Sequence, residues 1–100
     1  MKIQCQDGVL RVTEVKDLDG AEGLCEHVRA HWPEQVRAIE VDLSQTEFLN
    51  SSGLGQLLAL QKMAVQQCGK IALRVLNPSG PIQQFLELTR THRIFEILKR

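Results

Sequence analysis

The sequence predicts a single α/β domain with a mixed, mostly parallel sheet of four to five strands, an N-terminal hairpin and about three main helices. Apolar patterns typical of strands alternate along the chain with patterns typical of helices, and the connections between them are short. An Asp-Gly pair separates the first two strand patterns, which is a hairpin signal. The chain of 100 residues has the size of one domain, so we expect one hydrophobic core within residues 1–100.

The first strand patterns cover residues 2–6 and 9–15. Between them, Asp7 and Gly8 supply the positive φ angles that a tight turn requires, and the first strand is expected to pair antiparallel at an edge of the sheet.

A helix follows the hairpin, and Asp17 or Asp19 is expected to cap it. Pro33 ends this helix, because proline disrupts a helix interior. Its apolar stripe has the spacing of one helix face and consists of Ala21, Leu24, Cys25, Val28 and Trp32.

Three strand patterns and two helix patterns complete the chain. Residues 38–43 alternate apolar and polar side chains, and 71–76 and 94–98 are short apolar runs, so each predicts a strand. A short helix is expected around residues 82–86, after a turn at 77–81.

The long helix of the prediction runs from Leu54 to about Cys68 and ends at Gly69. Gln61 interrupts its apolar face, and Met63 is expected to point away from it. The expected core-facing residues are Leu54, Leu57, Leu58, Ala64, Val65 and Cys68.

Composition excludes several classes of function. Twelve basic residues balance twelve acidic ones, so no long-range field would attract nucleic acid or an anionic membrane. No apolar run is long enough to span a bilayer or to act as a leader, and we expect a cytoplasmic protein that does not insert into a membrane.

Neither the cysteines nor the histidines predict a metal site or a disulfide framework. The three cysteines, Cys5, Cys25 and Cys68, are widely spaced within apolar patterns, and we expect them to be small buried side chains. His27 and His31 lie four residues apart, but no glutamate occupies the zincin position between them, so a solvated helix face is the expectation.

The segment after the strand at 38–43 is the candidate site. In an open α/β sheet, binding sites gather where strands end and helices begin. Asn50 is a strong N-cap residue, and Ser51, Ser52 and Gly53 would form a first helical turn that tolerates negative charge. A phosphate on that turn would change the recognition surface without unfolding the domain. On local pattern alone, however, such a stretch is usually just a capped turn.

Residues 41–44 and 48–55, with the sequences Val-Asp-Leu-Ser and Phe-Leu-Asn-Ser-Ser-Gly-Leu-Gly, closely resemble the signature of STAS domains of the anti-sigma factor antagonist type. In that signature a strand leads to Asp-Ser-Ser-Gly-Leu-Gly. Further matches occur at Asp17-Leu18-Asp19, at Leu76-Asn77-Pro78 and at residues 94–97, so the resemblance covers nearly the whole chain.

The resemblance implies a phosphorylation switch at Ser51. In the family, a serine kinase with a histidine-kinase-like ATP-binding fold, which is also the anti-sigma factor, phosphorylates this serine, and a PP2C-type phosphatase removes the phosphate. The unphosphorylated antagonist binds the kinase and frees the sigma factor. Carried over, Ser52 and Gly53 frame the acceptor, the helix from Leu54 contributes to the partner surface, and Asp19 matches an acidic residue near the site.

One position departs from the family pattern, because Asn50 replaces the aspartate of the signature. Asparagine keeps the cap and removes a negative charge beside the serine. If the carboxylate helps to engage the kinase, phosphorylation is weak or absent here and the chain acts as a constitutive binder.

We expect a binding module and not an enzyme. No histidine lies near Ser51 in the sequence to activate it, and Gly53 and Gly55 match neither the P-loop nor the dinucleotide pattern, so no cofactor is expected. Two alternatives stay open: a STAS subunit of an ABC-type lipid transport system, and a scaffold or dimerisation domain that uses the open sheet edge or an exposed Leu60 and Met63.

Overall fold

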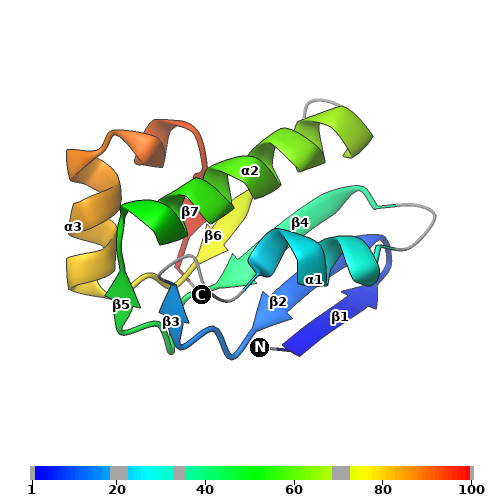
Figure 1. Cartoon of the computed structure of the whole chain (residues 1–100), viewed down its shortest axis with the longest axis horizontal. Helices are drawn as coiled ribbons and strands as arrows, with labels where there is room; N and C mark the ends of the chain where they lie inside the picture. Colours follow the sequence, from blue (N-terminus) through cyan, green and yellow to red (C-terminus); the bar gives the residue numbers. More distant parts are fainter. Residues whose placement is uncertain (1, 19–22, 33–35, 69–72, 100) are drawn as a thin grey trace.

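The structure is a computed structural model that describes residues 2–18, 23–32, 36–68 and 73–99. Its main sheet has five strands in the order β1-β2-β4-β6-β7 (Figure 1). Their bounds are β1 Lys2–Gln6, β2 Val9–Thr13, β4 Ala38–Asp42, β6 Arg74–Leu76 and β7 Glu96–Leu98. The β1–β2 pair is antiparallel and every other pair in this sheet is parallel. The predicted α/β class, the mostly parallel sheet and the N-terminal hairpin are confirmed.

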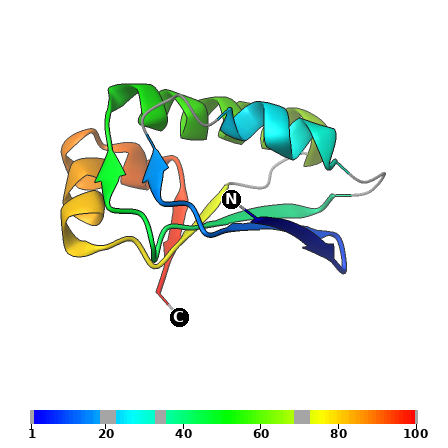
Figure 2. The ribbon, with the colours of Figure 1, turned by 60° about the horizontal axis from the view of Figure 1, so that its bottom comes forward.

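The described part of the chain contains three α-helices. Their bounds are α1 Leu24–Ala30, α2 Ser51–Cys68 and α3 Gly80–Leu88, with a 3₁₀ turn, η1, at Thr91–Arg93. Figure 2 shows α1 and α2 on the same face of the sheet, whereas no described helix covers the other face. The sheet therefore has a buried face and an open face.

The alternation of side chains along each strand produces the buried face and the open face. Leu10 and Val12 on β2, Ile39 and Val41 on β4, and Val75 on β6 are buried beneath the helices. Their neighbours in each strand point to the opposite, open face, because successive strand side chains alternate.

A second, two-stranded sheet lies beside the start of α2 and was not predicted. It pairs β3, Asp17–Leu18, in parallel with β5, Phe48–Leu49. The expected helix cap at Asp17 is therefore wrong, because Asp17 lies in a strand. The N-cap position of α1 is Gly23 at φ 63°, and Asp19 lies outside the described residues.

The buried face of α2 is rotated from the predicted one. Leu60 is fully buried in the core, whereas Val65 is 45% exposed. Met63 is partly buried against the core, so neither Leu60 nor Met63 provides the exposed patch that was one of the two surfaces expected for a scaffold domain. Gln61 occupies a polar niche, where its side-chain oxygen accepts a hydrogen bond from the Leu73 backbone N–H.

The expectation of buried cysteines is wrong for Cys5, which is exposed, and Cys25 is only partly buried. Cys5 lies on β1, one of the two edge strands of the main sheet, where most side chains are exposed although Ile3 packs partly against the core. Pro33, Gly69 and the side chain of Cys68 lie outside the described part of the chain.

The last strand is shorter than expected, because residues 91–93 form η1 and Ile94 is 45% exposed before β7 begins at Glu96. Among the described helices, none combines the length and the apolar character needed to cross a bilayer.

Candidate functional site

The segment that leads into α2 is held in place by hydrogen bonds to the residues that precede β3. The Thr46 hydroxyl is buried and donates to the Val15 carbonyl at 2.5 Å, and the Glu47 N–H donates to the Lys16 carbonyl at 2.8 Å. The next two residues, Phe48 and Leu49, form β5, which pairs with β3. Because these contacts anchor residues 46–49, the start of α2 has a defined position at the end of the molecule.

Asn50 caps α2, as predicted from the sequence. Its side-chain oxygen accepts a hydrogen bond from the Gly53 N–H at 2.9 Å, and its carbonyl accepts the first helical bond from the Leu54 N–H at 2.8 Å. The Asn50 N–H donates to the Leu18 carbonyl at 3.3 Å, which ties the cap to β3. The amide thus performs the capping role that a carboxylate would perform at this position.

The first turn of α2 has one exposed side and one buried side. Ser51 and Ser52 are exposed to solvent, whereas Gly53 and Leu54 are buried. A Cβ atom at Gly53 would lie 2.5 Å from the carbonyl carbon of Leu18, well inside van der Waals contact. Glycine is therefore required for α2 to approach β3 this closely, and the approach turns both serines outward.

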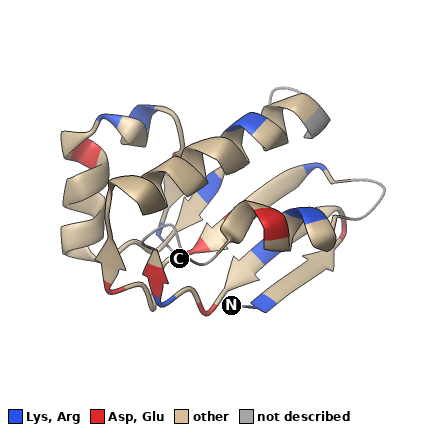
Figure 3. Cartoon of the chain, in the orientation of Figure 1, with Lys and Arg blue, Asp and Glu red and all other residues tan. Residues whose placement is uncertain are grey.

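An aromatic and an acidic side chain lie on the two short strands beside the serines. The first turn of α2 carries no charged residue. Phe48 is 50% exposed on β5, and its strand partner is the exposed Asp17 (Figure 3). Positive partial charge from the free N–H groups of the turn faces this end of the molecule. A phosphate on Ser51 would be compatible with the helix terminus and would project toward a partner.

Of the residues expected at the site, the structure brings Asn50, Ser51, Ser52, Gly53 and Leu54 together in one turn. Asp19 lies outside the described residues.

Sequence reasoning missed Phe48 and Asp17 as neighbours in this surface. Their proximity depends on the β3–β5 pairing, which joins segments about thirty residues apart; only the family-like runs at both segments could have indicated it.

No group of three or more His, Cys, Asp or Glu side chains within the described residues has a geometry that could hold a metal ion. His27 on α1 and His31, directly after the end of α1, are exposed, and Nδ1 of each lies 2.9 Å from the backbone carbonyl oxygen four residues earlier.

Comparison with known proteins agrees with this geometry. A family model described as "Mlab, STAS domain" matches residues 1–98. No curated protein matches the chain. The family model covers nearly the full length, including the hairpin, the strand before the site and the capped turn. The chain therefore belongs to the STAS domain family.

Proposed function

We propose that this chain is a protein-binding module of the anti-sigma factor antagonist type, controlled by phosphorylation of Ser51. The observation that carries the proposal is that Ser51 is exposed on the capped first turn of α2. Gly53 in the same turn packs directly against the backbone of Leu18. Such a serine is accessible to a kinase, while the backbone that carries it is held in place.

The charge distribution indicates how phosphorylation would act. No Lys or Arg occurs in the first turn of α2, so that turn has no cationic side chain to neutralise a phosphoserine. The helix dipole stabilises the added charge by about 0.3–1 kcal/mol, too little to alter the fold. The phosphate would instead add up to about two negative charges to the surface near Phe48 and Asp17, and a partner shaped for a neutral serine would be repelled.

The proposed partners follow from the family resemblance. The unphosphorylated form binds a serine kinase with a histidine-kinase-like ATP-binding fold, which is also the anti-sigma factor, and a PP2C-type phosphatase restores that form. Phe48 provides the apolar contact of the surface, because a half-exposed aromatic side chain near the centre of an interface contributes strongly to affinity.

The test is phosphorylation of the chain by the serine kinase encoded beside it, with the modified residue located by mass spectrometry. We expect phosphate on Ser51. Ser79 is a matched control, because it is also exposed and lies at the start of a helix, α3. Phosphate on Ser51 and Ser79 alike would indicate unspecific modification.

Measurements of kinase affinity distinguish the effect of a negative charge at residue 51 from the effect of a larger side chain there. Ser51→Asp adds a charge and Ser51→Asn adds a neutral side chain of the same size. We expect Ser51→Asp to weaken binding of the kinase well beyond the effect of Ser51→Asn. Equal affinity of the two variants would exclude an electrostatic switch.

A second candidate is a constitutive STAS subunit of an ABC-type lipid transport system. Two observations favour it: the matching family model is described as Mlab and not as an antagonist, and Asn50 lacks the family carboxylate. This candidate predicts no phosphate on Ser51, and retention of the chain by the transporter's ATPase.

A further inference from the structure

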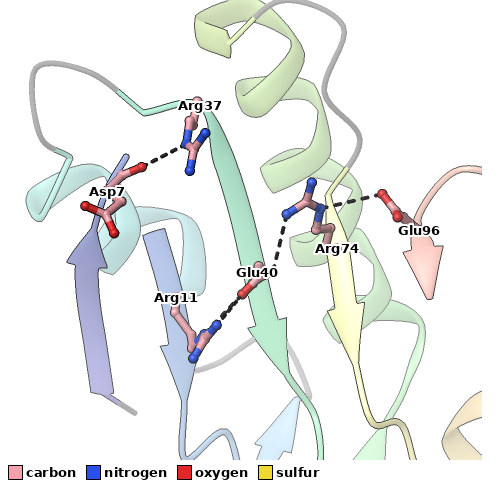
Figure 4. A network of polar contacts seen from close by, with 6 residues as sticks. All are labelled: Asp7, Arg11, Arg37, Glu40, Arg74 and Glu96. Atoms are coloured by element: carbon pink, nitrogen blue, oxygen red, sulfur yellow. Dashed lines mark hydrogen bonds and ion pairs between the residues drawn. The ribbon is translucent and has the colours of Figure 1, made fainter. Parts of the chain in front are cut away.

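A row of charged side chains crosses the open face of the sheet, on the side opposite the helices. The strand register aligns Gln4, Arg11, Glu40, Arg74 and Glu96, one residue from each of the five strands. The charges alternate along this row, and Figure 4 shows the side chains meeting in sequence across β2, β4, β6 and β7.

Glu40 is the fixed centre of the row. Its side chain is only 2% exposed, although it lies on the face that no described helix covers. Arg11 donates to Oε1 at 2.8 Å through Nη2 and at 3.1 Å through Nε, and Arg74 donates to Oε2 at 3.4 Å. The carboxylate is thereby covered by two guanidinium groups and holds both in defined orientations.

Neither guanidinium is saturated by these contacts, because the group has more N–H donors than the contacts use. Arg74 Nε is buried without a hydrogen bond in the described structure, since Glu96 Oε2 lies 3.6 Å away. Arg11 is 46% exposed, so the part of its guanidinium that is turned away from Glu40 is accessible from solvent.

A third guanidinium lies at the hairpin end of the same face. Arg37 donates from Nε to the Asp7 carbonyl at 2.8 Å, and its backbone N–H donates to the Gly8 carbonyl. These two hydrogen bonds hold Arg37 against the hairpin turn, with both terminal nitrogens of its guanidinium directed away from Asp7 (Figure 4).

A hollow of about 330 Å³ lies between these groups. Two residues along each strand from Arg11 and Glu40, on the same face, the strands carry the short side chains Val9 and Ala38. Arg37, Arg74 and Val9 also line an adjoining hollow of about 220 Å³, together with Ala38. The lining of the larger hollow is Gln4, Gln6, Asp7, Val9, Arg11, Arg37, Glu40 and Arg74.

The charge and donor content of the lining define the ligand. Three guanidinium groups and two carboxylates, those of Glu40 and Asp7, line the hollow. A third carboxylate, that of Glu96, lies outside the lining at 3.6 Å from Arg74 Nε, so the guanidinium of the lining that forms no ion pair within the described residues is that of Arg37. Both oxygens of Glu40 already accept hydrogen bonds from arginine, and the donors that remain are guanidinium and carboxamide N–H groups. Guanidinium groups recognise phosphate oxygens through paired hydrogen bonds.

We propose that this hollow binds a phosphate group carried on a small molecule, with Arg37 as its main ligand-binding residue. The site lies at the hairpin end of the sheet, away from the start of α2 (Figure 1), and does not depend on phosphorylation of Ser51. The STAS domain would then carry two separate recognition sites.

The experiment is an NMR titration of the whole chain with inorganic phosphate at constant ionic strength, since salt alone screens surface charges. We expect saturable shifts of the Val9 and Ala38 amides and of the arginine Nε–H signals, with a dissociation constant of about 1 mM or below. Shifts that increase in proportion to phosphate without saturation would refute the site.

Arg37→Gln is the test variant, because Arg37 is exposed and its loss leaves the Glu40 ion pairs intact. It should weaken phosphate binding about tenfold or more. Arg29→Gln, at an exposed arginine on α1, removes the same charge elsewhere and should bind as the wild type does. Arg37→Lys should recover part of the affinity, and equal binding by the Arg37→Gln and Arg29→Gln variants would overturn the assignment.

Two further probes identify where the phosphate comes from. Glycerol 3-phosphate tests a soluble ligand, and phosphatidylcholine vesicles that contain phosphatidic acid test a lipid headgroup. Saturable binding of glycerol 3-phosphate without sedimentation on vesicles would support a soluble ligand. Sedimentation that Arg37→Gln abolishes would support a headgroup, whereas sedimentation that survives this change, without saturable phosphate binding, would contradict the site.

Discussion

Adding one methyl group at Gly53 tests whether α2 packs directly on β3. In Gly53→Ala the new Cβ would lie 2.5 Å from the carbonyl carbon of Leu18, whereas carbon atoms in contact are about 3.5–4.0 Å apart. The helix start must therefore move by roughly 1 Å or more. That movement would break the 3.3 Å hydrogen bond from the Asn50 N–H to the Leu18 carbonyl.

The expected change in the free energy of unfolding of Gly53→Ala is the sum of opposing contributions. Overpacking costs about 1–3 kcal/mol and the lost hydrogen bond adds about 1 kcal/mol. The better helix propensity of alanine offsets about 0.5–1 kcal/mol. The net loss in the free energy of unfolding is about 1–3 kcal/mol, which lowers the Tm of a domain of this size by roughly 5–20 °C.

Gly55→Ala is the matched control in the same helix. No atom lies within 4 Å of a Cβ built at Gly55, so only the propensity change applies. We expect this variant to gain about 0.5–1 kcal/mol. Thermal unfolding followed by circular dichroism measures both variants. A Gly53→Ala variant at least as stable as wild type, or two variants that lose equal stability, would refute the packing argument.

Three other perturbations test separate parts of the structure. Glu40→Ala should cost about 3–5 kcal/mol in denaturant unfolding because it leaves two arginines without their buried partner; Glu96→Ala, at an exposed partner, should cost less than about 1 kcal/mol, and similar losses would contradict a buried ion pair. Asn50→Ala should lose about 0.5–2 kcal/mol with the cap, while Asn50→Asp stays near wild type; an Asn50→Ala variant of unchanged stability would show that the cap contributes nothing. Burial raises the pKa of the Cys25 thiol and Glu26 raises it further, whereas Arg29 lowers it, so alkylation of Cys25 should require higher pH than that of an ordinary thiol. Glu26→Gln should move the pH profile of Cys25 alkylation, measured by mass spectrometry, to lower pH, and an unmoved profile would exclude the charge contribution.

Local chemistry allowed much of the fold to be predicted. Asp7-Gly8 places the hairpin because few other pairs adopt two successive positive φ angles, and the structure has φ 54° and 80° there. The alternation of apolar and polar residues from Ile39 onward identifies β4. Asn50 marks the start of α2 because its side chain satisfies a helix N–H that has no partner within the helix.

The surface around Ser51 could be predicted only in part. The serine and its cap belong to one continuous segment, so local pattern and family resemblance were sufficient. Phe48 and Asp17 join the surface through β3 and β5, and strands of two residues are too short to show a periodic pattern.

The sequence by itself determined the elements whose signals are local: the turn, the alternating strand, the capped helix and the exposed serine within it. Only the tertiary structure decided which side of α2 is buried, with Leu60 inside and Val65 outside, because the rotation of a helix depends on the sheet beneath it. It also decided the burial of Glu40, whose partners Arg11 and Arg74 are 29 and 34 residues away in the chain. A glutamate between Ile39 and Val41 in a strand indicates an exposed position by pattern. It becomes buried only when the strand order places an arginine on each side to compensate its charge.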